Sequence, residues 1–110
     1  MIRIGVLISG SGTNLQAILD AVAARTLSAE IAVVVSNVAT AKGLERARAA
    51  SVPTVVLDHR AYATREQFDA AVVAALTDHQ VDYVVLAGFM RLVTGSVLHV
   101  HSLLTLTPHW

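Results

Sequence analysis

The fold is decided by one stretch near the N-terminus, Ile2-Arg3-Ile4-Gly5-Val6-Leu7-Ile8-Ser9-Gly10-Ser11-Gly12-Thr13-Asn14-Leu15. Its first seven residues are mostly apolar and predict a buried strand, and the Ser/Gly run that follows predicts a tight loop. Thr13 or Asn14 suits the N-cap of a helix. The apolar face of that helix recurs at Leu15, Ile18, Leu19 and Val22. A strand, a glycine-containing loop and a helix therefore follow one another directly.

The alternation of strand and helix continues along the chain. Apolar runs predict further strands at residues 31–35, 55–57, 84–87 and 103–106. Helices are expected at about residues 40–50 and after Thr64, because Thr64 and Gln67 form a capping-box pattern ahead of a periodic apolar face. This order predicts an α/β fold, a Rossmann-like doubly wound and mostly parallel sheet with helices on both faces.

The composition narrows the kind of ligand. Of the 110 residues 55% are hydrophobic and 15% are charged, which excludes a disordered chain. The formal net charge is zero, so nothing favours a nucleic acid or an acidic membrane as partner, and no apolar run approaches the ~20 residues that span a bilayer. The absence of cysteine excludes disulfides and thiolate metal sites and fits a cytoplasmic protein. We therefore expect a small-molecule ligand.

In open α/β sheets, ligands bind outside the carboxyl ends of the strands. Four segments reach that edge in the predicted fold: Ser9–Asn14, Ser36-Asn37, Asp58-His59 and Gly88–Arg91. The first offers free N–H groups at a helix N-terminus, which favours an anion such as phosphate. It is neither a Walker A loop nor a complete G-x-G-x-x-G, because Leu15 holds the third glycine position. A tight turn with a helix cap is the alternative interpretation.

Arg65 follows the expected cap Thr64 and places a positive charge at the positive end of a helix dipole. A misfit of this kind suggests an anionic partner. The alternative, which the residues alone favour, is a solvated arginine with Asp69 one turn further on.

The segment Gly88-Phe89-Met90-Arg91 leaves a buried strand with a glycine, two large apolar side chains and a cation. This combination suits an aromatic ligand that carries a carboxylate, although Phe89 and Met90 as core residues are the alternative. The five histidines do not form a metal pattern, because His99 and His101 lie two apart with no third ligand near them in sequence. We expect no metal.

Five segments in this order are specific together: Gly5–Ile18, Val35-Ser36-Asn37, Gly43–Ala47, Arg65-Glu66 and Val85–Arg91. They resemble the folate-dependent phosphoribosylglycinamide formyltransferases of de novo purine (IMP) biosynthesis, nearly collinearly from Met1 to about Val93. The resemblance implies direct transfer of a formyl group from the co-substrate 10-formyltetrahydrofolate to the amine of glycinamide ribonucleotide. The amine would attack the formyl carbon, with donors for the oxyanion and a proton for the leaving nitrogen.

The resemblance also implies roles for individual residues. Gly12, Thr13 and Asn14 would hold the nucleotide substrate, chiefly at its phosphate. The folate site would be lined by Arg65, Met90, Arg91, Leu92 and Val93. In that site Arg91 would lie near the carboxylate-bearing tail, and backbone groups of Leu92 and Val93 would contact the pteridine.

The chain departs from the family where the catalytic strand is expected. Family members carry Asn-x-His-Pro on the fifth strand and a catalytic Asp further on, whereas this chain has Leu104-Thr105-Leu106-Thr107-Pro108. Threonine does not titrate near neutral pH, so Thr105 and Thr107 cannot replace those residues and no catalytic residue is carried over. We expect residues 1–110 to form the N-terminal nucleotide-binding domain of a formyltransferase, with a sheet truncated after about five strands and no activity of its own.

Residues 94–110 form an atypical tail, for which a shifted reading frame is one hypothesis. Leu104 to Trp110 can be encoded CTA ACA CTC ACC CCG CAC TGG, and the same bases read two positions later give Asn-Thr-His-Pro-Ala-Leu. An engineered fragment and a diverged tail are the alternatives. The DNA sequence after the Val93 codon distinguishes them.

Other functions stay open beside the transformylase. One is a sibling enzyme that uses the same folate, such as a formyltetrahydrofolate hydrolase or a transfer-RNA formyltransferase. The loop Gly10–Asn14 at the N-terminus favours the ribonucleotide substrate over both. Another is a truncated, non-catalytic nucleotide-binding fragment. A sheet that ends at its fifth strand also leaves an open edge, so we expect self-association.

Overall fold

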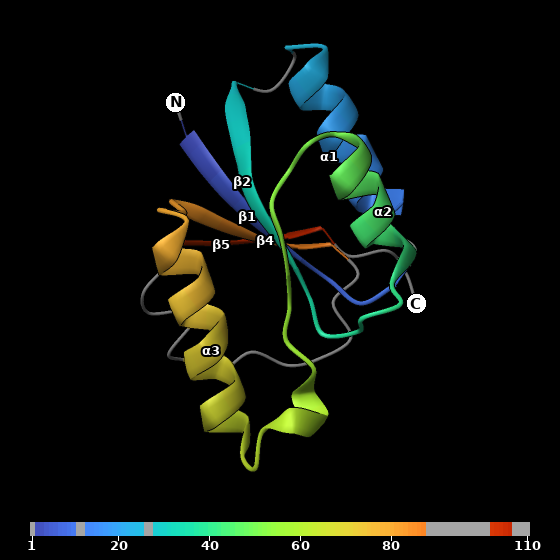
Figure 1. The fold of residues 1–110 in the computed structure, drawn as a ribbon. Coiled ribbons are helices and arrows are strands. Elements are labelled where there is room, and N and C mark those ends of the chain that lie inside the picture. The colour runs from blue at the N-terminus through green and yellow to red at the C-terminus, as the bar shows by residue number, and fades with distance from the viewer. Residues whose placement is uncertain (1, 11–12, 26–27, 88–101, 107–110) are drawn as a thin grey trace.

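The computed structural model describes residues 2–10, 13–25, 28–87 and 102–106, which contain one five-stranded sheet. Its strands are β1 (Ile2–Ile8), β2 (Ala29–Ser36), β3 (Thr54–Val56), β4 (Tyr83–Ala87) and β5 (Ser102–Leu106). All neighbouring strands pair in parallel, in the order β3-β2-β1-β4-β5 (Figure 1). This is a doubly wound order, so the predicted Rossmann-like parallel sheet is confirmed.

The helices lie on both faces of this sheet, as predicted. Two of them, α1 (Thr13–Ala23) and α2 (Lys42–Ala49), cover one face, and α3 (Arg65–Asp78) covers the other (Figure 1). A short 3-10 helix, His59–Ala61, lies in the connection between β3 and α3. Within the described residues, no helix has the length and apolar character needed to cross a membrane.

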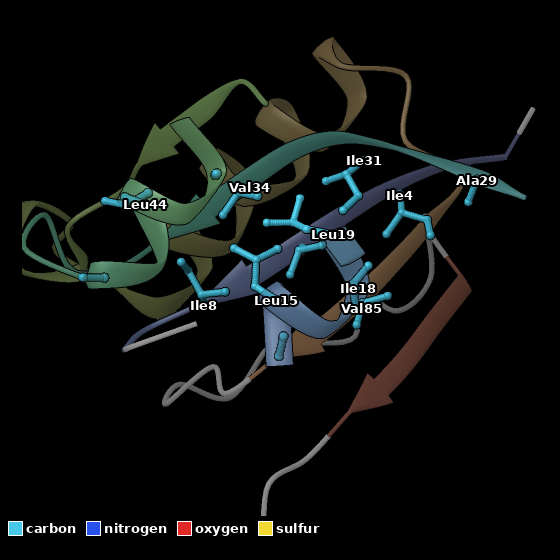
Figure 2. Close-up of a cluster of buried hydrophobic side chains, with 14 residues drawn as sticks. Ile4, Ile8, Leu15, Ile18, Leu19, Ala29, Ile31, Val34, Leu44 and Val85 are labelled. Atoms are coloured by element: carbon cyan, nitrogen blue, oxygen red, sulfur yellow. The ribbon is translucent and has the colours of Figure 1, made fainter. Parts of the chain in front are cut away.

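Strand β1 contributes side chains to both apolar layers because successive side chains point to opposite faces of the sheet. Ile4, Val6 and Ile8 pack with Leu15 and other α1 and α2 residues in what we call the α1–α2 cluster (Figure 2). Leu7 packs on the opposite face, in the α3 cluster. Fully buried members of that cluster include Val33, Val35, Phe68, Val72, Leu76 and Val84.

A register shift interrupts the pairing of β1 with β2. Ile4 pairs with Ile31 but Gly5 pairs with Val33, so Ala32 is an extra residue in β2. Ala32 and Val33 accordingly both pack in the α3 cluster, where strict alternation would have separated them. The shift has the character of a β-bulge.

Gly5 allows α3 to approach the middle of β1 closely. A Cβ atom at this position would lie 2.6 Å from Leu76 Cδ2 and 3.1 Å from a methyl group of Val81. A side chain here would therefore push α3 away from the sheet.

The observed element boundaries differ in part from those predicted. Strand β2 begins at Ala29, two residues early, because its first residues pair with Ile2 and Arg3 although Glu30 is exposed. Helix α1 begins at Thr13, so Thr13 and Asn14 lie in its first turn and the prediction that one of them is the N-cap is wrong. Boundaries of this kind are the least certain part of sequence-based assignment.

The predicted capping box of α3 is present in a modified form. Thr64 Oγ1 accepts a hydrogen bond from the backbone N–H of Gln67 over 3.2 Å. The Gln67 side chain reaches one residue further back than in the usual motif and accepts from the backbone N–H of Ala63 over 3.1 Å. Both bonds fix the start of α3.

Candidate functional site

The carboxyl ends of β1 and β2 meet, as predicted, because the two strands are neighbours in the sheet. Ser9 Oγ donates a hydrogen bond of 2.6 Å to Asn37 Oδ1. Ser36 is fully buried and Asn37 is only 5% exposed. Two segments that lie 28 residues apart in sequence are therefore joined by a neutral polar contact at the predicted site.

The loop after β1 also contacts the start of α2. The carbonyl oxygen of Gly10 accepts a hydrogen bond of 3.1 Å from the backbone N–H of Gly43. The residue that caps α2, Ala41, makes no side-chain capping bond. Gly10 therefore supplies an acceptor to a helix terminus that its own cap leaves unsatisfied.

The N-terminus of α1 is the part of this edge best suited to an anion. The first N–H groups of a helix have no acceptor within the helix, and the helix dipole is positive there. The first turn of α1 contains no acidic residue that would compete with a bound anion. Thr13 and Asn14 lie in this turn, whereas Gly12 and the side chains of Thr13 and Asn14 lie outside what the structure describes.

Arg65 and Asp69 lie one turn apart on α3, but Arg65 is exposed and Asp69 is buried. Arg65 is the first residue of α3 and is exposed, and its guanidinium makes no hydrogen bond or ion pair within the described part of the chain. Asp69 is buried, with 1% of its surface exposed. Arg65 is thus solvated, but the alternative interpretation that gave it Asp69 as a surface partner is wrong.

Asp58 belongs to the third segment expected at this edge, Asp58-His59, and its carboxylate is bound within its own loop. Its carboxylate binds the Arg60 guanidinium, with Nη2 and Oδ2 2.8 Å apart, and accepts from the Arg60 backbone N–H over 2.9 Å. The hydrogen bond and the charge of Asp58 raise the pKa of Arg60 above its ordinary value. Asp58 therefore stabilises the turn into the 3-10 helix.

Four residues of the expected folate site, Met90, Arg91, Leu92 and Val93, lie outside the described ranges. So do Thr107 and Pro108, which stand where the family's Asn-x-His-Pro is expected. Thr105 lies in β5, where it pairs with Leu86. Within the described residues, no cluster of three or more His, Asp or Glu side chains could hold a metal ion.

A cavity of about 860 Å³ lies at the other end of the sheet. Its walls come from the end of α1, the start of β2 and the loop before β3, and include Leu19, Val22, Ile31 and Val52. None of the predicted site residues lines it. Volume alone would favour this cavity as the binding site, but the anion-binding groups lie at the carboxyl end, and we place the candidate site there.

Arg3 organises the amino end beside this cavity. Its Nε and Nη2 atoms donate to the carbonyl oxygen of His79, over 3.0 and 2.8 Å, at the end of α3. Its Nη1 atom forms an ion pair with Glu30. The backbone N–H of Arg3 donates to Asp82 Oδ2 over 2.9 Å. The charge of Arg3 is therefore used in joining β1, β2 and α3.

Comparison with known proteins identifies relatives over almost the whole chain. Residues 2–109 match the sequence model of the family described as formyl transferase. A phosphoribosylglycinamide formyltransferase of Escherichia coli is 42% identical over 115 aligned residues, which cover 96% of this chain and 54% of that protein. The trifunctional purine biosynthetic protein adenosine-3 of Gallus gallus is 46% identical over 94 residues, 86% of this chain and 9% of that protein.

The fold has a close counterpart among solved structures. The glycinamide ribonucleotide transformylase 1 of Symbiobacterium toebii superposes with a TM-score of 0.92 and 52% sequence identity, over 96% of this chain and 50% of that one. This chain thus spans about half the length of the bacterial formyltransferases that it matches.

Proposed function

The chain belongs to the formyl transferase family, and we propose that it is the nucleotide-binding half of a phosphoribosylglycinamide formyltransferase. In the proposed reaction, 10-formyltetrahydrofolate is the donor and the amine of glycinamide ribonucleotide is the acceptor, in purine biosynthesis. The observation that carries the proposal is the 52% identity to the transformylase of Symbiobacterium toebii over nearly the whole chain.

The nucleotide would bind at the start of α1. The N–H groups of its first turn and the preceding loop would hold the phosphate, with Gly12, Thr13 and Asn14 as the contacting residues. Ser9 and Gly10, which are fixed by Asn37 and Gly43, support this loop from the sheet.

The folate would bind beside α3. When bound, 10-formyltetrahydrofolate would supply the formyl group, and the residues of this chain would hold and orient the folate. Arg65 fits an anionic group because it is exposed and has no ion-pair partner among the described residues. Met90, Arg91, Leu92 and Val93 complete the proposed folate site.

We further propose that the 110-residue chain binds the nucleotide without catalysing the transfer. The family's Asn-x-His-Pro sequence does not occur in these 110 residues. A non-catalytic nucleotide-binding fragment is thus the second candidate, and the observation that favours it is Leu104-Thr105-Leu106-Thr107-Pro108 in place of that sequence.

The sibling enzymes are less well supported. A formyltetrahydrofolate hydrolase or a transfer-RNA formyltransferase would use the same folate, but the relatives reported above bear phosphoribosylglycinamide or purine biosynthetic names. We propose a cytoplasmic location, small-molecule partners and no metal requirement.

Calorimetry and a turnover assay test the proposal together. We expect glycinamide ribonucleotide to bind the folded chain weakly, and we expect no transfer when 10-formyltetrahydrofolate is added. Absence of heat with ligand in large excess would refute nucleotide binding. Turnover that is abolished by Arg91→Ala would refute the proposed inactivity.

We also propose that the chain self-associates through β5. Of the described strands only β4 pairs with it, and the outer edge of a sheet is a template on which another strand can pair. Light scattering should show species larger than a monomer, and a monodisperse monomer would contradict the proposal.

A further inference from the structure

The loop that follows β1 is held at two consecutive residues by two different elements. Ser9 is bound through its side chain to Asn37, at the end of β2, over 2.6 Å. Gly10 is bound through its carbonyl oxygen to the N–H of Gly43, in the first turn of α2, over 3.1 Å. Together these bonds fix the first two residues of the loop against β2 and α2.

Contacts other than the one with Ser9 also restrict the position of Asn37. The fully buried Ser36 closes a turn around it, because Ser36 Oγ donates to the carbonyl oxygen of Val38 over 2.7 Å and accepts from the Val38 N–H over 3.0 Å. Asn37 is 5% exposed, so few alternative positions are open to its side chain.

Apolar packing holds both sides of this arrangement. Ile8, which precedes Ser9, and Leu44, which follows Gly43, are both fully buried in the α1–α2 cluster (Figure 2). The two hydrogen bonds therefore join segments whose backbones are already immobilised by the core.

The amide of asparagine suits this position chemically. Its oxygen accepts the Ser9 hydroxyl, and the contact brings no charge to an edge that presents N–H groups to an anion. An aspartate could accept the same hydrogen bond, but its negative charge would repel a phosphate nearby.

We propose that Asn37 is a positioning residue of the candidate site, which acts through Ser9 to fix the start of the phosphate-binding loop. The inference rests on the proposed function only in taking that loop to bind phosphate. The geometry of the Ser9–Asn37 and Gly10–Gly43 contacts can be tested without any ligand.

Hydrogen exchange of the Gly43 amide tests the positioning in the ligand-free chain. Loss of the Ser9–Asn37 bond should let Gly10 move away from Gly43. We expect this amide to exchange about tenfold faster in both Asn37→Ala and Ser9→Ala. Ser28→Ala, the same Ser-to-Ala change at an exposed residue just before β2, should leave the rate unchanged. Unchanged exchange in both loop variants would overturn the proposal, and Ser9→Ala decides if Asn37→Ala does not fold.

Calorimetry with glycinamide ribonucleotide tests the consequence for binding. Each single variant should bind about tenfold more weakly, and the double variant no more weakly than the weaker single one, because both changes remove the same bond. In Asn37→Asp the Gly43 amide should exchange as slowly as in the unaltered chain, because the carboxylate can still accept from Ser9. This variant should still bind the nucleotide weakly, because its negative charge repels the phosphate. If the losses of affinity in the two single variants add up in the double variant, and Asn37→Ala causes the larger loss, the positioning role is overturned. Asn37 would then contact the nucleotide directly. If the unaltered chain does not bind this nucleotide, the proposed function fails, while the exchange result still decides the positioning.

Discussion

The two ends of the sheet use their polar groups differently. At the amino end, the guanidinium of Arg3 is fully engaged with the His79 carbonyl and with Glu30. At the carboxyl end, Arg65 has no ion-pair partner in the described part of the chain, and the contact between Ser9 and Asn37 is neutral. The comparison teaches that the charge of Arg3 at the amino end holds the fold together, whereas at the carboxyl end Asp58 and Arg60 pair with each other and the charge of Arg65 is available to a ligand.

The helices reinforce this division. All three begin at the carboxyl end, where their dipoles are positive, and the amino end receives their C-termini (Figure 1). There the residues Arg25, Ser51 and Gln80, which follow the three helices, adopt positive φ values of 60°, 60° and 56°. Two of these residues, Arg25 and Ser51, line the cavity, which therefore lies away from the helix starts that attract anions.

Removal of the Arg3 side chain should give the largest effect on stability. Arg3→Ala leaves the His79 carbonyl without its two donors, and we expect the free energy of unfolding to fall by about 2 kcal/mol in urea denaturation. Glu30→Gln is the control, because it removes only a half-exposed ion pair and should cost at most about 0.5 kcal/mol. Equal losses in both variants would mean that the ion pair, and not the helix end, stabilises this region.

Thr64→Ala should have a smaller effect, at the other end of the sheet. It removes the acceptor of the Gln67 N–H, and we expect a loss of about 1 kcal/mol in the free energy of unfolding. Thr64→Ser keeps the oxygen and should restore most of it. Equal stability of the Ala and Ser variants would show that the cap does not stabilise α3.

Arg65→Glu should give the smallest effect on stability, with the opposite sign. A negative charge at the first position of α3 suits the helix dipole, so we expect thermal and urea denaturation to show a gain of about 0.5 kcal/mol. Binding of a folate carboxylate should weaken in the same variant. A loss of stability would break the comparison, because Arg65 would then serve the fold as Arg3 does.

Much of the fold could be predicted because buried strands and capped helices have local sequence signals. The apolar runs of β2 and β4 and the Thr64–Gln67 box each specify an element within a few residues. The same local reasoning misplaced the start of α1. It could not foresee the extra residue Ala32 in β2, since that depends on pairing with β1.

The site was less predictable, because its contacts join residues that are distant in sequence. Ser9 and Asn37 each follow a buried strand, which places them at one edge, but only the adjacency of β1 and β2 shows that they bind each other. Asp69 was misassigned because spacing to Arg65 suggests a surface pair. Its spacing of three and seven residues from Val72 and Leu76, which are fully buried, is the signal for burial.

The central place of β1 has a consequence for synthesis of the protein. Strand β1 leaves the ribosome before the other described strands, yet one of its two neighbours, β4, is translated about eighty residues later, as the pairing of Ile4 with Tyr83 shows. A nascent chain that ends before β4 can pair β1 with β2 alone, and its other edge stays open to foreign strands. Chaperone demand during translation should therefore fall sharply once Tyr83–Ala87 emerge.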